Sequence, residues 1–226
     1  MPAVDSVSSF ASNGTGPFTW SHTCSGSDRF LIVGIAHYDS GDIVSGVTYD
    51  GVAMTAVPLG ATSNGTSYLC FITLYYLIAP NTGTHDIVVS VTGGVFDFGA
   101  GATSYTDVHQ TTPLGPAATA IGTSTTPSVT VSSAVNEIVF DSLSIIHGGT
   151  LSVGAGQTQR WNSITPNGYL KYAGSTEGGA ASTTMSWSNS SSQTWAIVAV
   201  PIKPTGGGSG GPNITGAHYQ YRKRRL

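Results

Sequence analysis

Charged side chains are scarce in this chain. Asp, Glu, Lys and Arg make up 8% of its 226 residues, whereas they make up about a quarter of an ordinary soluble domain. A surface built from Ser, Thr and Gly in their place is typical of all-β extracellular or virion proteins, and it argues against an ordinary cytosolic enzyme. The composition also argues against disorder, because 39% of the chain is hydrophobic and these residues fall into strand-length blocks.

Catalytic groups are equally sparse. The only glutamates are Glu137 and Glu177. A glycosidase needs two carboxylates that converge across a cleft, whereas Glu137 and Asp141 share one face of a single expected strand, where we expect solvated side chains. The six histidines do not show metal-ligand spacing. We therefore expect a protein that is not an enzyme and that needs no cofactor.

A weak calcium candidate is present in the segment His37-Tyr-Asp-Ser-Gly-Asp42. Asp39 and Asp42 would supply oxygen ligands, but their spacing is not that of an EF-hand. Asp in a turn commonly accepts hydrogen bonds from the local backbone instead. We predict no metal, with this loop as the one candidate for Ca²⁺.

The chain has two cysteines, Cys24 and Cys70, and nothing in their surroundings resembles a zinc motif. A disulfide between them would join an early strand to the middle of the chain across a long loop. Two buried free thiols are the alternative, and the favoured one, because free Cys behaves as a small buried hydrophobe.

No segment is long and apolar enough for a membrane helix. The longest apolar run, Leu69–Ala79, falls well short of the roughly 18 residues that a span requires. The first ten residues lack a basic and then apolar signal pattern, so we expect no secretion signal. A virion-surface protein made in the host cytoplasm would lack a secretion signal and still have a composition typical of extracellular proteins. An extracellular or cell-surface domain with its leader removed is the alternative.

Strand signals, in contrast, run through most of the chain. The stretch Ser67–Ile78, rich in aromatic and β-branched residues and bounded by turn residues, predicts a central strand covered on both faces. Asp50-Gly51 predicts a two-residue hairpin turn. The other expected strands are 3–10, 18–24, 30–36, 47–49, 52–57, 86–92, 98–106, 127–133, 137–146, 151–161, 168–175, 183–187 and 194–203. Pro201 should place the last of these at a sheet edge or end it.

These signals predict an all-β fold, an antiparallel two-sheet β-sandwich or jelly-roll-like domain over residues 1–203. No repeat of 20–50 residues is evident. Residues 204–212 form a Gly-rich linker, and residues 213–226 form a basic C-terminal arm.

The arm concentrates half of the chain's basic residues. All eleven acids and four of the eight Lys and Arg residues precede it, so an acidic body ends in a cationic tip. We expect the arm to dock onto a neighbouring virion subunit or an identical copy, giving a homo-oligomer or repeated copies on a particle. We expect neither nucleic acid, which an acidic body repels, nor a membrane as a partner. The docking residues would be Tyr219, Tyr221, Arg222, Lys223, Arg224 and Arg225.

Three aromatic residues in the later half are candidates for stacking on a host-surface glycan: Trp161, Tyr169 and Trp187. Their segments are polar and Gly-rich, which suits exposed rings. Packing into the core is the alternative, and it is the usual role of Trp in a sandwich.

Three segments carry a resemblance: Val47–Thr55, Leu74–His85 and Gly101–Leu114. Together they resemble uncharacterised β-sandwich domains of phage head or tail proteins and of bacterial surface proteins. The resemblance spans residues 5–203 and brings no catalytic residues. It implies a non-enzymatic structural protein of a virion, for example a capsid decoration or tail protein. A carbohydrate-binding or adhesive module is the alternative.

Overall fold

The computed structural model describes residues 1–39, 41–64 and 70–206. Within these ranges the chain forms seventeen strands and no helix, and every pairing between strands is antiparallel. The all-β antiparallel sandwich expected from the sequence is therefore confirmed. The described residues contain no helix that would be long and apolar enough to cross a membrane.

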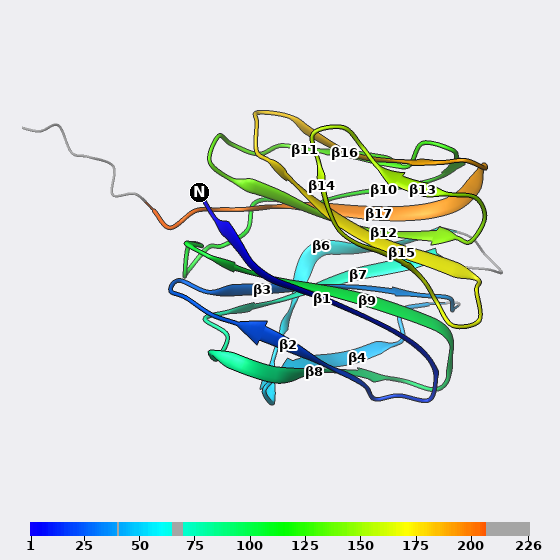
Figure 1. Cartoon of the computed structure of the whole chain (residues 1–226), viewed down its shortest axis with the longest axis horizontal. Helices are drawn as coiled ribbons and strands as arrows, with labels where there is room; N and C mark the ends of the chain where they lie inside the picture. Colours follow the sequence, from blue (N-terminus) through cyan, green and yellow to red (C-terminus); the bar gives the residue numbers. More distant parts are fainter. Residues whose placement is uncertain (40, 65–69, 207–226) are drawn as a thin grey trace, which may run out of the picture.

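The strands form four sheets stacked in four layers (Figure 1), where the sequence predicted two sheets. We number the sheets in the order of stacking. Sheet I contains β2 (Phe18–Cys24), β8 (Gly83–Val91), β4 (Val44–Tyr49) and β5 (Val52–Ala53). Sheet II contains β1 (Ala3–Gly14), β9 (Val95–Thr106), β3 (Phe30–His37), β7 (Cys70–Ile78) and β6 (Thr55–Asn64).

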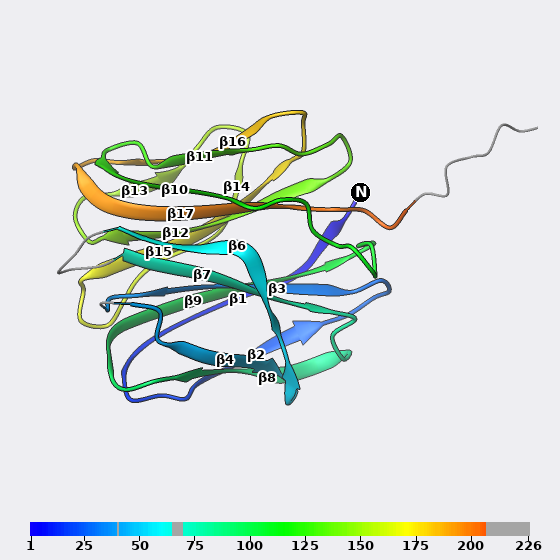
Figure 2. The ribbon, with the colours of Figure 1, turned by 180° about the vertical axis from the view of Figure 1, so that it is seen from behind.

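The later half of the chain forms the other two layers. Sheet III contains β10 (Ala118–Ser124), β17 (Gln193–Ile202), β12 (Ile138–Ile146), β15 (Leu170–Gly178) and β14 (Thr158–Ile164). Sheet IV contains β11 (Ser128–Val131), β16 (Thr183–Asn189) and β13 (Leu151–Val153). The view from behind shows the same order of layers (Figure 2).

The two halves match strand for strand. When the short β5 is set aside, the order β1-β9-β3-β7-β6 of sheet II becomes β10-β17-β12-β15-β14 in sheet III. The order β2-β8-β4 of sheet I likewise becomes β11-β16-β13 in sheet IV. The molecule is thus two copies of one sandwich packed back to back through their five-stranded sheets. A repeat of half the chain is too long to fall within the 20–50-residue periods of solenoid repeats.

Three hydrophobic cores fill the spaces between the four layers. The outer cores lie between sheets I and II and between sheets III and IV, and the middle core lies between sheets II and III. Because sheets II and III are covered on both faces, their inner strands are buried along most of their length. β3, with all eight residues buried, is the middle strand of sheet II.

The long strand expected at Ser67–Ile78 is observed as β7, and residues 67–69 lie outside the described residues. β7 is second from the edge of its sheet, next to β6, so β3 and not β7 is central. The sequence did not predict β10, whose small and hydroxyl residues resemble a loop, and it merged β13 and β14 into one strand. The turn at Asp50-Gly51 has the expected positive φ angles, 49° and 73°.

β17 ends at Ile202, one residue after Pro201, as the proline suggested. It is an inner strand, however, because β10 pairs with it on one side and β12 on the other. The pairing with β10 stops at Ala199, and Pro201 faces a loop on that side, where its carbonyl accepts a hydrogen bond from Gly115 N at 2.9 Å. The missing N–H therefore breaks no ladder bond there.

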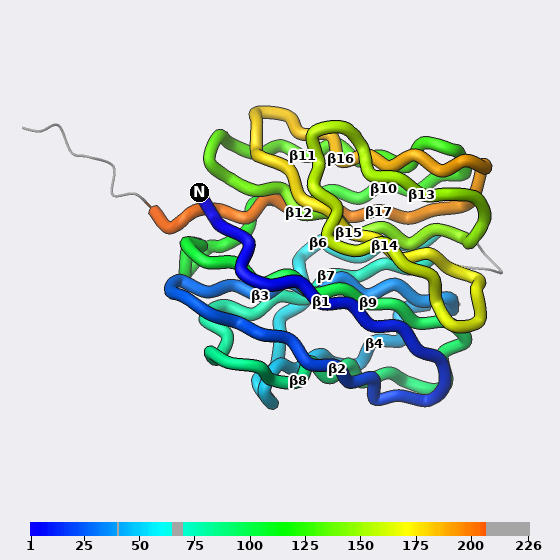
Figure 3. The backbone as a smooth tube through the Cα atoms, viewed as in Figure 1, coloured from blue at the N-terminus to red at the C-terminus, as the bar shows by residue number. Residues whose placement is uncertain are grey.

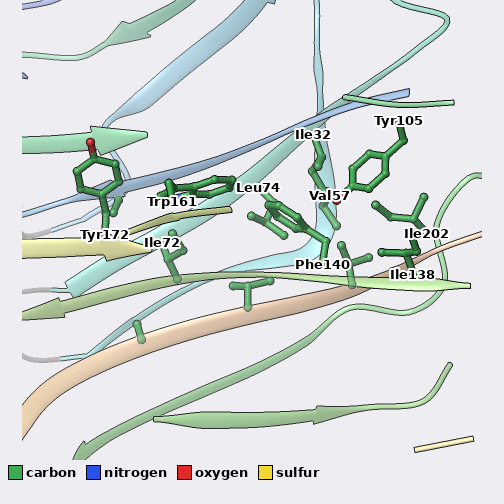
Figure 4. Packing of buried hydrophobic residues seen from close by; sticks show 14 of the residues in the cluster. Ile32, Val57, Ile72, Leu74, Tyr105, Ile138, Phe140, Trp161, Tyr172 and Ile202 are labelled. Carbon is green, nitrogen blue, oxygen red and sulfur yellow. The ribbon is translucent and has the colours of Figure 1, made fainter. Parts of the chain in front are cut away.

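Trp161 of β14 is the largest side chain in the middle core, where Figure 4 shows it beside Leu74. A Cβ atom added to Gly101 of β9 would lie 2.1 Å from the indole, and one added to Gly174 of β15 would lie 2.3 Å from it. Glycine at these two positions therefore makes the space for the ring. Trp161 is 5% exposed.

We expect Trp161→Ala to lower the free energy of unfolding by about 3–5 kcal/mol, because a cavity remains between sheets II and III. Trp161→Phe should cost less, since it keeps most of the packing and removes an indole N–H that has no partner among the described residues. Urea unfolding of both variants measures this. Equal stability of Trp161→Ala and the unmutated chain would contradict the assignment of Trp161 to the core.

Candidate functional site

Three aromatic rings gather at one end of the stacked sheets. Tyr38 follows β3, Phe96 is the second residue of β9, and Tyr169 immediately precedes β15. The ring centroids are 5.4 Å apart for Tyr38 and Tyr169, 4.9 Å for Phe96 and Tyr169, and 6.0 Å for Tyr38 and Phe96. Phe96 is 50% exposed and Tyr169 46% exposed, which is unusual for large apolar rings in a chain with three filled cores.

The rings line a cavity of about 540 Å³ together with Ile146 and Thr194. We call this cavity the aromatic groove. Its walls come from both halves of the molecule, since Tyr38 and Phe96 belong to the first sandwich and the other three residues to the second. The groove therefore lies at the seam between sheets II and III.

A buried carboxylate fixes the aromatic groove. Asp97, fully buried, accepts hydrogen bonds from the backbone N–H of Asn167 at 2.9 Å and of Tyr169 at 2.8 Å. Its own backbone carbonyl accepts a hydrogen bond from Tyr38 N at 3.0 Å. One residue thus orients two of the three rings.

The turn before Tyr169 reaches across to the first sandwich. The end of the β14–β15 hairpin lies beside the start of β9, as the tube in Figure 3 shows. Asn13 Nδ2 donates to Asn167 Oδ1 at 3.0 Å, and the Asn167 amide in turn donates to the Phe96 carbonyl. These contacts hold the groove open without a ligand. A preformed, mostly apolar pocket with a few fixed polar groups is the usual form of a small-molecule site.

Of the three aromatic residues proposed to stack on a glycan, only Tyr169 is exposed. Trp161 packs in the middle core, and Trp187, 2% exposed, packs in the core between sheets III and IV. Their indole faces are covered by protein, so neither can stack on a sugar, and this part of the prediction is wrong. Gly174, in one of these segments, makes room for the Trp161 ring.

Tyr38 and Phe96 were not predicted from the sequence. The signal available for Phe96 was its position after the turn Gly93-Gly94, where an apolar residue next to buried Val95 must point outward. Tyr38 carries no comparable signal, because its role depends on the approach of the second sandwich.

The cysteines are free and buried. Cys24 belongs to the core between sheets I and II, and Cys70 belongs to the middle core. The two thiols thus lie on opposite faces of sheet II, which excludes the disulfide in this structure.

The calcium candidate is not supported by the geometry. Asp42 Oδ1 accepts a hydrogen bond from Val44 N at 3.0 Å, the local capping role. The described part of the chain has no group of three or more His, Cys, Asp or Glu residues arranged to hold a metal ion. The docking residues Tyr219, Tyr221, Arg222, Lys223, Arg224 and Arg225 lie outside the described residues.

One serine and one histidine lie at the spacing of a nucleophile and its base. Ser8 Oγ is 2.8 Å from His22 Nδ1, and Trp20 Nε1 donates to the same oxygen at 3.1 Å. His22 is 2% exposed, so no substrate can reach its ring. Burial lowers the pKa of His22 to about 4, which keeps the ring neutral. The pair joins edge strand β1 of sheet II to β2 of sheet I.

Asp141 is buried, which corrects the expectation that it is solvated. Its Oδ1 accepts hydrogen bonds from Ser175 N at 2.6 Å and Ser175 Oγ at 2.7 Å, and its Oδ2 accepts one from Trp187 Nε1 at 2.8 Å. The carboxylate therefore connects β12, β15 and β16 across the core between sheets III and IV. Burial raises the pKa of Asp141 to about 7. Glu137, which precedes Asp141 in the sequence, caps its own turn by accepting a hydrogen bond from Ala134 N at 2.8 Å.

When the chain was compared with family models, with curated proteins and with solved structures, nothing matched. The resemblance to phage and bacterial surface domains thus stays a prediction from the sequence.

The pKa of Asp141 predicts a stability that depends on pH. An unfolded Asp has a pKa near 3.9, so between pH 4 and 7 the folded chain holds a proton that the unfolded chain has lost. The stability contributed by this proton is complete below pH 4 and is lost as the pH rises through 7. Buried His22 and His37, with pKa values of about 4, act in the opposite direction up to pH 6.5.

Comparison with Asp141→Asn isolates this carboxyl group, because both histidines are present in each chain. We expect the free energy of unfolding of the unmutated chain, relative to Asp141→Asn, to fall by about 1–3 kcal/mol between pH 4.5 and pH 8. Urea titrations at several pH values measure it. The exposed Asp28→Asn serves as the control. A difference that does not change with pH would show that Asp141 is ionised throughout.

Proposed function

We propose that the protein is a non-enzymatic adhesive module that binds a saccharide in the aromatic groove. The observation that carries this proposal is the pair of half-exposed rings, Phe96 and Tyr169. The Tyr169 N–H donates a hydrogen bond to the Asp97 carboxylate, and the Phe96 carbonyl accepts one from the Asn167 amide, so the backbone at both rings is held in place. Sugar rings present faces of C–H bonds that pack on aromatic faces, and a Tyr hydroxyl beside them offers a polar contact. Thr194, which also lines the groove, gives a further polar group.

The position of the aromatic groove supports a displayed module. β17 (orange in Figure 1) starts beside the groove at Gln193 and ends at Ile202 at the opposite end of the sheets. There the chain is fixed by hydrogen bonds from His109 N to Lys203 O at 3.0 Å, from Lys203 N to Pro113 O at 2.7 Å, and from Thr205 N to Asp107 O at 2.8 Å. An anchor at residues 203–205 would point the groove away from whatever the C-terminal segment binds.

Binding should depend on the two exposed rings. We expect the double variant Phe96→Ala, Tyr169→Ala to bind its best saccharide at least tenfold more weakly, because a ring-stacking surface is lost. A glycan array selects the saccharide, and calorimetry measures the affinity. The variant Ile121→Ala removes another exposed hydrophobic side chain, 52% exposed and on β10, and should bind as the unmutated chain does.

Two outcomes would contradict the proposal. One is a complete array with no bound saccharide. The other is a saccharide whose affinity is the same in the double variant. Circular dichroism of both variants checks that the sheets are intact.

A second candidate is a structural subunit of a virion, capsid-decorating or tail-associated, that assembles through residues 213–226. The observation that favours it is the separation of charge in the sequence, an acidic body before a tip of four consecutive cations, Arg222–Arg225. Opposite charges between copies would favour association, and salt would weaken it. The two candidates are compatible, since a subunit fastened at one end can bind a glycan at the other.

Deletion of residues 207–226 tests the second candidate and leaves the anchor at residues 203–205 intact. We expect the shortened chain to lose self-association, or incorporation into particles, as measured by sedimentation. The full-length variant in which Gln replaces all four of Arg222–Arg225 should show the same loss if charge is the cause. Unchanged assembly of the shortened chain would refute docking by this segment.

A further inference from the structure

Lys171 is the one buried cation among the described residues. It is the second residue of β15 and is 7% exposed. Its Nζ donates to the Gly149 carbonyl, and within the described residues no Asp or Glu lies at ion-pair distance from it. Lys is rarely buried without a charged partner, and burial lowers the pKa of this ammonium.

The side chain lies in a second cavity, of about 450 Å³, lined by Thr150, Leu151, Asn162, Ser163, Ile164 and Lys171. We call it the lysine pocket. It is formed mainly by hydroxyl, amide and ammonium groups, unlike the aromatic groove.

Hydrogen bonds fix the walls of the lysine pocket. Asn189 donates to Gly148 O at 2.6 Å and to Ser191 O at 2.7 Å, which holds the loop that carries the Gly149 carbonyl. Thr150 N donates to Ser190 Oγ at 2.8 Å, and Asn162 Nδ2 donates to Leu151 O at 2.9 Å. The pocket is therefore a built feature of the second sandwich.

The fold does not need a lysine at this position. When β7 is matched with β15 from their first residues, Cys70 and Leu170, the residue that corresponds to Lys171 is Phe71. In the first sandwich Phe71 stacks on His37, with the ring centroids 4.6 Å apart and the planes 12° from parallel. An aromatic pair thus fills the same place in the same architecture. A buried cation in the second copy, which costs desolvation energy, points to a use for its charge.

We propose that the lysine pocket binds an oxyanion, that is, the carboxylate, sulfate or phosphate group of a small ligand. The Lys171 ammonium has three N–H donors and uses one on Gly149, so two remain for the anion. The hydroxyl of Thr150 lies beside the same cavity as a further donor. The acidic body repels large polyanions, which favours a small ligand with one anionic group.

Titration of the ¹⁵N-labelled full chain with acetate, sulfate and phosphate at constant ionic strength tests the proposal. We expect saturable shifts of the backbone amides of Gly149, Thr150 and Ser163 with a dissociation constant of about 1 mM. Lys171→Met should weaken binding at least tenfold and should fold well, since the first sandwich holds Phe71 at this place. Lys203→Met removes the same charge near the opposite end of β17 and should bind within twofold of the unmutated chain.

Glucuronate and glucose, added in separate titrations, identify the source of the oxyanion. Tighter binding of glucuronate than of acetate, both lost in Lys171→Met, assigns the pocket to an acidic saccharide, and equal affinities assign it to free small anions. Shifts that do not saturate, or that survive in Lys171→Met, would overturn the proposal. The Phe96→Ala, Tyr169→Ala variant should leave this titration unchanged, so failure of the aromatic groove and failure of the lysine pocket are distinguishable.

Discussion

The face-to-face packing of sheets II and III is the constraint on which the rest of the structure depends. The two five-stranded sheets are each covered on both sides, so their middle strands, β3 and β12, are buried along almost their whole length and do not alternate between buried and exposed residues. Close approach requires small residues where the strands cross. A Cβ on Gly34 would lie 2.3 Å from Ser142 Oγ, and Gly101 and Gly174 leave room for Trp161. The scarcity of charge follows in part from this, because four layers leave few solvated faces.

The repeated sandwich explains where chemistry can appear, since corresponding positions differ where one copy holds a group that the other lacks. Matched from their first residues, Phe30 of β3 and Ile138 of β12, Val33 corresponds to Asp141. β9 pairs with β3 in the same register as β17 pairs with β12, so the match extends to these two strands. In them Asp97 corresponds to Thr194. In each pair one copy has an apolar or neutral side chain and the other a buried carboxylate. Both carboxylates accept two or more hydrogen bonds, so each is held by donors that its counterpart does not need.

Local patterns in the sequence predicted the strands well because they report whether one or both faces of a strand are buried. The apolar run Phe30–Ala36 and the turn at Asp50-Gly51 are such cases, and both agree with the structure. These patterns do not report which sheet covers a face, since the same run fits two sheets or four. For the same reason Trp161 and Trp187 could not be placed from composition. The aromatic groove could not be foreseen, because Tyr38, Phe96 and Tyr169 meet only through packing of the two halves.

The aromatic groove is best understood as the end of the middle core. Between sheets II and III the core closes over most of its length, with Tyr105 and Ile202 near one end (Figure 4). At the other end Asp97 accepts the backbone N–H of Tyr169, and the hairpin turn is thereby held against β9. Hydrogen bonds to the buried Asp97 carboxylate hold the backbone of the groove in place before any ligand binds. The groove is therefore preorganised, and ligand binding need not be offset by the entropy of ordering its rings.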